Sequence, residues 1–263
     1  MIRLAAISIT IVIAGGALVA LLIVGYTFHR GHLPALTKAP FRDGFDGAVV
    51  DERLWEIDAD RDCRLEVVAS PGQREGTSLL VDAPAGARCE VLPILRRNLL
   101  GKLGHEPRDL SLSYAFSTYI PPGQTFSAAS NEVLAQWHGS PDFFLGDAPG
   151  RGPAVALRIE DGRTFLTSGW DDAFVSGEGR RDRELWSADL AQGTWEDWRF
   201  DIVWSHGEEG RLSVWRNGER VLDHRGPNSY NDLRNVYLKI GVYHPAFDRR
   251  AYFDDFRFEV VGP

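Results

Sequence analysis

Hydrophobic and polar residues alternate in short runs along most of the chain beyond residue 40. The clearest run is 237–243, with the sequence Tyr-Leu-Lys-Ile-Gly-Val-Tyr. Successive side chains of a strand point to opposite faces, so Leu238, Ile240 and Val242 are predicted to face a core. The other face would carry two phenols and a cation: Tyr237, Lys239 and Tyr243. Between these polar residues, Gly241 predicts a gap where a ligand could approach the backbone.

Similar runs recur at short spacing, separated by turn residues such as those at 121–123, Pro-Pro-Gly. The pair Asn217-Gly218 between two alternating runs is a strong hairpin signal. No helical period is visible beyond Phe28. Many short strands at this spacing indicate a sandwich or barrel. We therefore predict an all-β fold, a two-sheet antiparallel β-sandwich of the jelly-roll, concanavalin-like type.

One long apolar segment, from Leu4 to Phe28, holds no charged residue. A helix of about 25 residues spans a bilayer core of roughly 30 Å, whereas the apolar region of a cleavable signal peptide is about 7–15 residues long. We therefore predict a transmembrane anchor at 1–28, a linker rich in Pro and Gly at 29–40, and a folded domain at 41–263. Basic residues flank both ends of the apolar segment, so the positive-inside rule does not fix its orientation.

The formal net charge of −8 argues against general nucleic-acid binding. We expect a monomer. The two cysteines, Cys63 and Cys89, both fall in predicted strands and share parity with apolar neighbours. This arrangement suits a buried disulfide if the strands are neighbours, and it equally describes two separate buried thiols.

Two further runs carry polar groups opposite an apolar face. In 131–138, Gln136 and His138 share one face, and Val133, Ala135 and Trp137 are predicted to share the core face. In 88–91, Arg88 and Glu90 share a face opposite Cys89 and Val91. Each pair alone is weak evidence, because an Arg-x-Glu pair is most often a surface ion pair.

Taken in order, these motifs resemble those of the jelly-roll polysaccharide lyases. The motifs are Arg88-x-Glu90, Gln136-x-His138 and Tyr237-x-Lys239-x-Gly241-Val242-Tyr243. Alginate lyases of family 7 show this order most plainly, and the heparin lyase I and glucuronan lyase families belong to the wider group. The resemblance extends over roughly residues 41–260. Two positions depart from the alginate lyase pattern, with Leu92 where a second Arg is usual and His244 where Asn is usual.

The resemblance implies β-elimination at a uronic acid, which needs a neutralised carboxylate, a base for the C5 proton and an acid for the departing O4. By similarity, Arg88 and Gln136 would hold the carboxylate, and His138 would be the base or a partner of the base. Tyr243 would protonate O4, and could serve as both base and acid. Substrate-binding roles fall to Glu90, which would orient Arg88, to Lys239, which would favour the phenolate of Tyr243, and to Tyr237 and Arg97. Arg97 or Arg96 could replace the arginine absent at Leu92.

No cofactor is required by this chemistry. A structural Ca²⁺ is nevertheless conceivable where the first and last strands of such sandwiches pair, since Asp46 and Asp254 offer the hard oxygen ligands that this ion takes. The alternative is that Asp46 forms a turn and that Asp254 is solvated. The sequence does not decide between them.

Two other functions remain open at this stage. A non-catalytic carbohydrate-binding module would use the eight Trp to stack on sugars, but it would not require Gln136, His138 and Tyr243 together. A glycoside hydrolase needs two carboxylates about 5–10 Å apart, and no matching motif is visible. With an acidic polysaccharide as substrate and two cysteines, we expect the domain to face the periplasm or exterior from a bacterial inner membrane.

Overall fold

The computed structural model describes residues 41–95, 110–128, 131–143, 146–147, 150–177, 181–232 and 236–262. The predicted anchor at 1–28 and the linker at 29–40 lie outside these residues. Among the residues that are described, no helix is long and apolar enough to cross a membrane.

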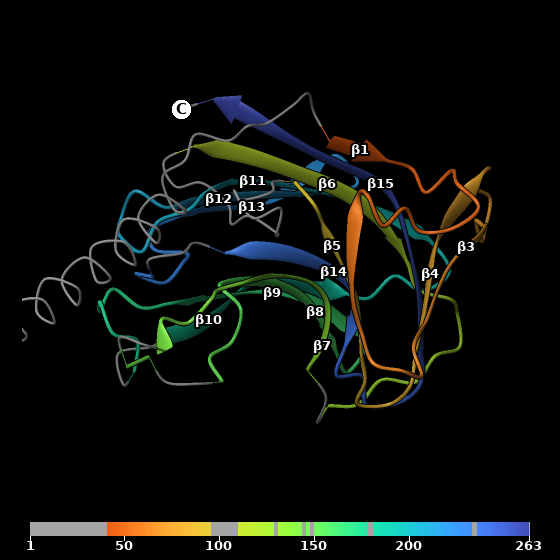
Figure 1. Cartoon of the computed structure of the whole chain (residues 1–263), viewed down its shortest axis with the longest axis horizontal. Coiled ribbons are helices and arrows are strands. Elements are labelled where there is room, and N and C mark those ends of the chain that lie inside the picture. The colour runs from red at the N-terminus through yellow and green to blue at the C-terminus, as the bar shows by residue number, and fades with distance from the viewer. Residues whose placement is uncertain are drawn as a thin grey trace, which may run out of the picture.

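Every named element in the described residues is a β-strand, and the strands form two antiparallel sheets that pack face to face (Figure 1). The first sheet has the order β13-β12-β11-β6-β15-β4-β3, with β1 paired to β15. Its strands are β13 (Glu219–Arg225), β12 (Arg211–Arg216), β11 (Trp195–Val203), β6 (Ser111–Tyr119), β15 (Arg249–Gly262), β4 (Thr77–Ala83), β3 (Arg64–Ala69) and β1 (Phe41–Asp43).

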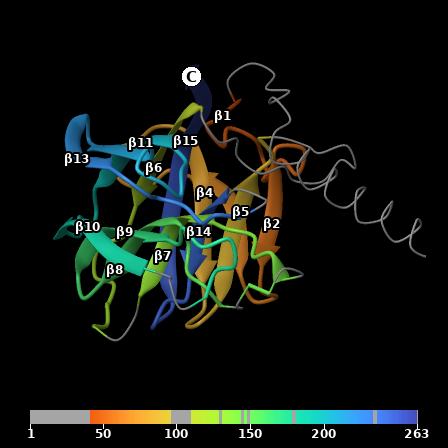
Figure 2. The same ribbon diagram turned by 90° about the vertical axis from the view of Figure 1, so that its left-hand side faces the viewer.

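The second sheet has the order β10-β9-β8-β7-β14-β5-β2, and its strands follow one another across Figure 2. Its strands are β10 (Arg181–Asp189), β9 (Arg163–Trp170), β8 (Val155–Glu160), β7 (Glu132–His138), β14 (Tyr237–Tyr243), β5 (Arg88–Pro93) and β2 (Trp55–Ala59). The predicted all-β, two-sheet antiparallel sandwich is therefore confirmed. The predicted hairpin is confirmed too, because Asn217 and Gly218 join β12 to β13 with φ values of 54° and 81°.

The core lies between the sheets and is built from the apolar face of each strand. Leu238, Ile240 and Val242 of β14 are buried in it, as the alternation in the sequence predicted. Trp137 of β7 lies 5.2 Å from Tyr114 of β6 and 4.9 Å from Phe200 of β11, measured between ring centroids. Large aromatic side chains from facing sheets thus bury most of their surface against one another.

Two further links join the sheets. Cys63 and Cys89 form a disulfide with a Cα–Cα distance of 5.6 Å. The sequence prediction placed both cysteines in strands, but Cys63 lies in the turn just before β3 and only Cys89 lies in a strand. The bond therefore connects the end of one sheet to β5 of the other. The second link is a buried ion pair, in which Arg249 of β15 donates to both carboxylate oxygens of Glu132 of β7.

Candidate active site

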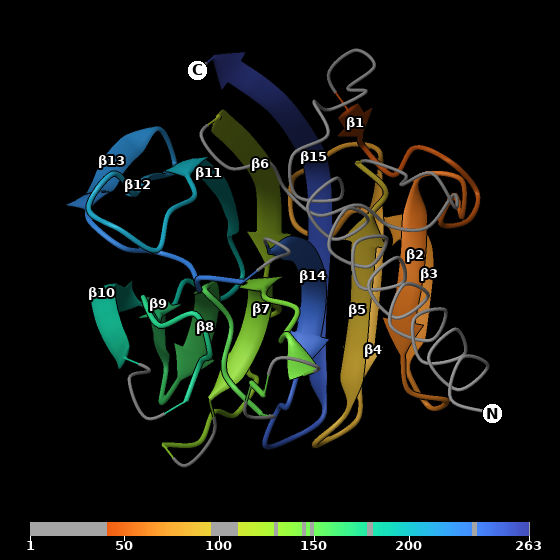
Figure 3. The same cartoon turned by 60° about the vertical axis from the view of Figure 1, so that its left-hand side comes forward.

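The three predicted motifs lie on three adjacent strands of the second sheet, with β14 between β5 and β7 (Figure 3). Their register aligns the polar residues across the strands. Tyr243 pairs with Arg88 on one side and with Val133 on the other. Lys239 pairs with Gln136, and Tyr237 pairs with His138. Segments distant in sequence thus place their polar side chains on the sheet face that points away from the core.

An open cleft of about 660 Å³ lies on this face. Its lining includes all four residues predicted to be catalytic: Arg88, Gln136, His138 and Tyr243. The described residues that line it include three arginines and no carboxylate, although the chain as a whole carries a net charge of −8. Arg88 and Arg151 also pair with carboxylates that are not among the lining residues, so the cleft offers a negatively charged ligand guanidinium donors rather than a large net positive charge.

Arg88 and Tyr243 contact each other directly at one end of this cleft. The guanidinium carbon of Arg88 lies 4.0 Å from the centroid of the Tyr243 ring. The His244 ring packs edge-on against Tyr243 at 4.6 Å. The stacked guanidinium holds the phenol ring beside the cleft, where its hydroxyl group can donate a proton.

Glu90 and Lys239 lie beneath the cleft and are not among its lining residues. Glu90 is almost fully buried, with one carboxylate oxygen 2.7 Å from Nη1 of Arg88 and 3.7 Å from Nζ of Lys239. The ammonium of Lys239 also pairs with Asp58 of β2. Burial raises the pKa of Glu90, while Lys239, Gln136 and Arg88 oppose that rise. Glu90 thus contacts Arg88 from beneath the cleft, and Lys239 contacts acidic side chains instead of the open cleft.

Gln136 connects this buried network to the cleft. Its amide nitrogen donates to the second carboxylate oxygen of Glu90. An amide nitrogen carries two hydrogens, so this bond fixes the amide group and leaves one hydrogen for a ligand. Glu90 therefore holds both Arg88 and Gln136, the two groups predicted to bind a substrate carboxylate.

His138 lies at the end of β7 and is held as a neutral ring. Its Nδ1 lies 2.7 Å from the carbonyl oxygen of Gly139, which can only accept, so Nδ1 carries the proton. In the neutral ring, Nε2 then has the lone pair. Burial lowers the pKa of His138, the hydrogen bond to Gly139 opposes that change, and the nearby cations Lys239, Arg88 and Arg151 lower the pKa further. At neutral pH this ring is therefore available as a base.

The remaining predicted binding residues have less direct positions. Tyr237 is not among the residues lining the cleft, and its ring lies 6.0 Å from that of His138 and 5.6 Å from Nζ of Lys239. Burial raises the pKa of Tyr237, with Lys239 opposing. Arg97 and Arg96 lie outside the described residues.

The structure gives Gly241 a different role from the predicted opening for a ligand. Its φ is +144°, a conformation that favours glycine. A Cβ placed there would lie 2.2 Å from the carbonyl oxygen of Cys89 and 2.7 Å from Cα of Glu90. Glycine is therefore required for close contact with the backbone of β5, not for access to the cleft.

The strand β7 also departs from simple alternation. Val133 was predicted to face the core, but it lines the cleft together with Gln136 and His138. The cause is a β-bulge, since Leu134 is an extra residue between the pairs that Val133 and Ala135 make with β8. Leu134 and Ala135 both enter the core, so the parity of the strand changes at this point.

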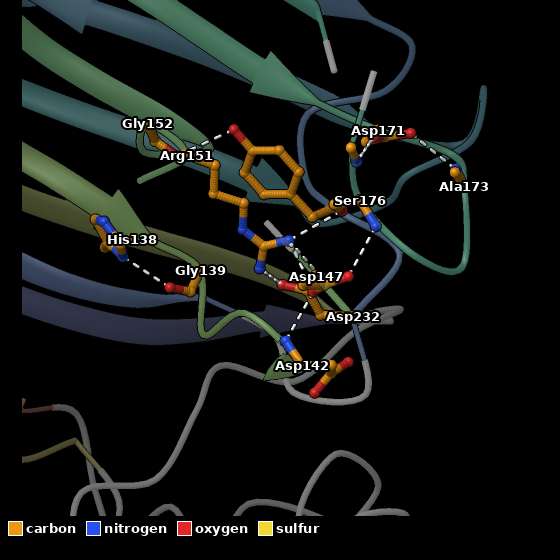
Figure 4. A network of polar contacts seen from close by, with 12 residues as sticks. His138, Gly139, Asp142, Asp147, Arg151, Gly152, Asp171, Ala173, Ser176 and Asp232 are labelled. Carbon is orange, nitrogen blue, oxygen red and sulfur yellow. Dashed lines mark hydrogen bonds and ion pairs between the residues drawn. The ribbon is translucent and has the colours of Figure 1, made fainter. Parts of the chain in front are cut away.

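A buried polar cluster closes the end of the cleft near His138 (Figure 4). Arg151 lines the cleft, and its guanidinium pairs with Asp147 and Asp232 and donates to Oγ of Ser176 at 2.9 Å. The ring of Tyr230 stacks on it, 4.3 Å from the guanidinium carbon. A Cβ on Gly139 would lie 3.2 Å from Nη2 of Arg151, so the backbone that accepts from His138 packs directly on this cluster.

Three carboxylates converge there on one guanidinium. Oxygens of Asp142, Asp147 and Asp232 all lie within 4.8 Å of one another. Burial raises the pKa of Asp232 to about 6, with Asp142 and Asp147 adding to the rise and Arg151 opposing it. Because Arg151 already pairs with two of the three, an arginine supplies the positive charge that a metal ion would otherwise bring.

The predicted calcium ligands do not form such a group among the described residues. The first and last strands do pair, with Asp43 of β1 opposite Phe256 of β15. However, Asp46 is exposed, and Asp254 pairs with Arg74 at 3.2 Å and accepts from the amide of Asp255. Arg74 occupies the place of a cation beside Asp254, so these residues do not fit a Ca²⁺ site.

Among the polar residues that line the cleft, Asn131, Arg151 and Arg158 were not singled out from the sequence. Arg158 had a usable signal, because Val155, Leu157 and Ile159 alternate with it and enter the core. Arg151 lies in a connection before β8 where no periodicity applies. Its role depends on tertiary contacts alone.

The fold and the cleft define a class, the jelly-roll sandwich with a cationic cleft that holds a histidine and a tyrosine on one sheet. The sequence model of the family described as polysaccharide lyase matches residues 53–257. The chain therefore belongs to the polysaccharide lyase family. A search of curated proteins gives no match.

Three solved structures are similar to this chain. An endo-β-1,4-glucuronan lyase from the fungus Trichoderma reesei is 14% identical, with a TM-score of 0.67, and the match covers 84% of this chain and 95% of that one. The alginate lyase AlgAT5 of polysaccharide lyase family 7 is 14% identical, with a TM-score of 0.47 over 80% of this chain and 94% of that one. The alginate lyase AlyC3 is 15% identical, with a TM-score of 0.46 over 69% of this chain and 74% of that one. Because the sequence identity is low, the similarity to the glucuronan lyase shows a shared fold.

Proposed function

We propose that this polysaccharide lyase cleaves a uronic-acid polymer by β-elimination in the cleft between Arg88 and His138. The observation that carries the proposal is the convergence of Arg88, Gln136, His138 and Tyr243 in one cleft whose described lining has no carboxylate. Such a site attracts a polyanion and offers both a base and an acid.

The proposed reaction assigns one task to each group. Arg88 and the remaining amide hydrogen of Gln136 bind the carboxylate of the sugar and stabilise the negative charge that develops when C5 loses its proton. Nε2 of His138 takes that proton, since Nδ1 is engaged with Gly139. The Tyr243 hydroxyl protonates O4 as the C4–O4 bond breaks, beside the guanidinium of Arg88. The product is an unsaturated uronic acid and a shortened chain.

The test is a panel of polymers of glucuronic, mannuronic and guluronic acid, and heparin, incubated with the purified full-length chain. The ultraviolet absorbance of the unsaturated product reports elimination. The neighbour of known structure with the highest TM-score reported above acts on glucuronan, so polyglucuronate is the first substrate to test.

Tyr243→Phe should lower kcat by about 100-fold or more, the usual size of a general acid's contribution. The matched control is Tyr252→Phe, because Tyr252 lies on β15 of the other sheet and should leave kcat unchanged. Full activity of Tyr243→Phe would contradict its role. If the chain binds a polymer tightly but forms no unsaturated product from any member of the panel, the alternative of a carbohydrate-binding module is favoured.

We also propose that the apolar segment 4–28 anchors the protein in a membrane with the domain outside the cytoplasm. The supporting observations are the uncharged length of that segment and the disulfide in the folded domain. Fractionation of cells that express the full chain should place it in the membrane fraction, and protease added to spheroplasts should digest the domain. Recovery of the intact chain in the soluble fraction would contradict the anchor.

A further inference from the structure

The register of the second sheet places two arginines at opposite ends of one row across the strands. Arg88 of β5 pairs with Tyr243, Tyr243 pairs with Val133, and Val133 pairs with Arg158 of β8. Neighbouring strands lie about 4.8 Å apart, so three steps separate the two backbones by roughly 14 Å. That distance accommodates more than one sugar ring.

Arg158 points to the cleft side of β8, because its neighbours Leu157 and Ile159 enter the core. Hydrogen bonds to two side chains help to hold its guanidinium in place. Nε donates to Oγ1 of Thr167 at 3.0 Å, and Nη1 donates to Oδ1 of Asn131 at 2.7 Å. Asn131 itself lines the cleft, so the guanidinium is held at the cleft wall rather than extended into solvent.

Tyr243 and Val133 lie between the two arginines in this row. Val133 lines the cleft, and the β-bulge at Leu134 is what turns it towards the cleft. The described lining between Arg88 and Arg158 therefore holds no carboxylate that would repel a uronic acid.

We propose that Arg158 binds the carboxylate of a second uronic acid in the same substrate chain, so that the polymer runs across the strands from Arg88 to Arg158. This inference rests on the proposed function. It adds a specificity: the enzyme requires a carboxylate on a sugar near the one that reacts, and it therefore prefers polymers of uronic acid alone to polymers in which uronic acids alternate with neutral sugars. The planar fork of an arginine suits this role, since it can bind both oxygens of a carboxylate.

The experiment compares Arg158→Gln and Arg158→Lys with the parent chain on tetrasaccharides of glucuronic acid and of mannuronic acid. Arg158→Gln should raise KM by about 10-fold or more with kcat changed by less than about 2-fold, the scale of one hydrogen bond to a charged group. Arg158→Lys should restore part of the loss, because the charge remains while the fork is absent. Arg64→Gln is the matched control, since Arg64 is an exposed arginine on β3 of the other sheet.

A second experiment removes the substrate carboxylate that Arg158 is proposed to bind, instead of the arginine. Tetrasaccharides with a single uronic acid reduced to the alcohol at each non-reacting position should show one position at which the parent chain loses affinity. At that position Arg158→Gln should show no further loss, as expected for two groups that contact each other. Equal losses in the parent and Arg158→Gln at every position would overturn the proposal.

Binding measured by calorimetry in the Tyr243→Phe background separates this proposal from the proposed function. If the parent chain forms no unsaturated product, the lyase reaction is wrong, but the weakening of tetrasaccharide binding by Arg158→Gln still tests Arg158. If product forms and the binding of both Arg158 variants equals that of the parent, the lyase reaction stands and the role of Arg158 is wrong.

Discussion

At the scale of single residues, the side chains that line the cleft are held in place by supporting residues behind them. Glu90 is the common partner of Arg88, Gln136 and Lys239, and Gly139 fixes the protonated nitrogen of His138. Each of these contacts orients a side chain that is proposed to touch substrate. Substitutions at the supporting residues should therefore alter both activity and stability.

The pKa of His138 lies below its ordinary value of 6.5, because of burial first and nearby cations second. The base must be neutral, so kcat/KM should rise with pH through this lowered pKa, and the midpoint of that rise should lie below pH 6.5. A pH profile on the preferred polymer measures this limb. An acidic limb centred above pH 7 would contradict the assignment. The folded state also resists protonation of His138, so the contribution of this residue to the free energy of unfolding should decrease as pH falls below 6.5, whereas Asp232, whose pKa is raised to about 6, acts in the opposite direction.

Glu90→Gln should be destabilising as well as damaging to activity. The substitution removes a buried negative charge that lies between Arg88, which is half-buried, and Lys239, which is buried, so each cation loses one of its two acidic partners. Breaking a buried pair costs about 3–5 kcal/mol of unfolding free energy. Urea unfolding followed by tryptophan fluorescence measures the loss. Glu66→Gln is the control, because the exposed Glu66–Arg64 pair should contribute less than about 1 kcal/mol.

At the scale of elements, β14 shows how far alternation predicts structure. Its core face and its polar face are those expected from the sequence, and the turn at Asn217-Gly218 is as well. The prediction failed for Val133 because a bulge depends on how β7 pairs with β8, which no local pattern encodes. The role of Gly241 was misjudged for the same reason, since the atoms it avoids belong to β5.

Gly241→Ala should destabilise the fold by about 2–4 kcal/mol, from backbone strain and overpacking together. The new Cβ would meet the backbone of Cys89 and Glu90, which cannot move without displacing Arg88. Thermal denaturation measures the effect. Gly218→Ala is the matched control: its φ is also positive at 81°, but no atom lies within 4 Å of the added Cβ. It should cost only about 1–2 kcal/mol. If both variants lost the same free energy of unfolding, the close contact between Gly241 and β5 would contribute little to stability.

At the scale of the whole molecule, the order of the motifs in the sequence was enough to predict that four residues share one site: Arg88, Gln136, His138 and Tyr243. It did not separate the residues that line the cleft from those beneath it, Glu90 and Lys239. The reason is that both sets share one strand face, and depth on that face depends on the neighbouring strand β2, where Asp58 pairs with Lys239. The cluster around Arg151 combines three separate connections between strands, and its residues have no common spacing.

Reduction of the Cys63–Cys89 disulfide should lower both stability and activity. The bond closes a separation of 26 residues, and a loop of this size corresponds to about 3–4 kcal/mol in the chain-entropy model. Cys89 is next to both Arg88 and Glu90, so loosening β5 should also disturb the carboxylate-binding groups. Melting temperature and kcat/KM with and without dithiothreitol test this effect. The double variant Cys63→Ala/Cys89→Ala should have the properties of the reduced protein and should not respond to the reagent.

The bulge in β7 also bears on how related chains should be compared. Asn131, Val133, Gln136 and His138 all line the cleft, although the spacing between the second and third is three residues instead of two. A strand that lacked Leu134 would alternate regularly and would present the same four side chains on the same face. A related chain that lacks one residue at this point in a sequence alignment would therefore keep the same side chains on the cleft wall. Distant lyases are better aligned here by the direction of each side chain than by counting positions between motifs.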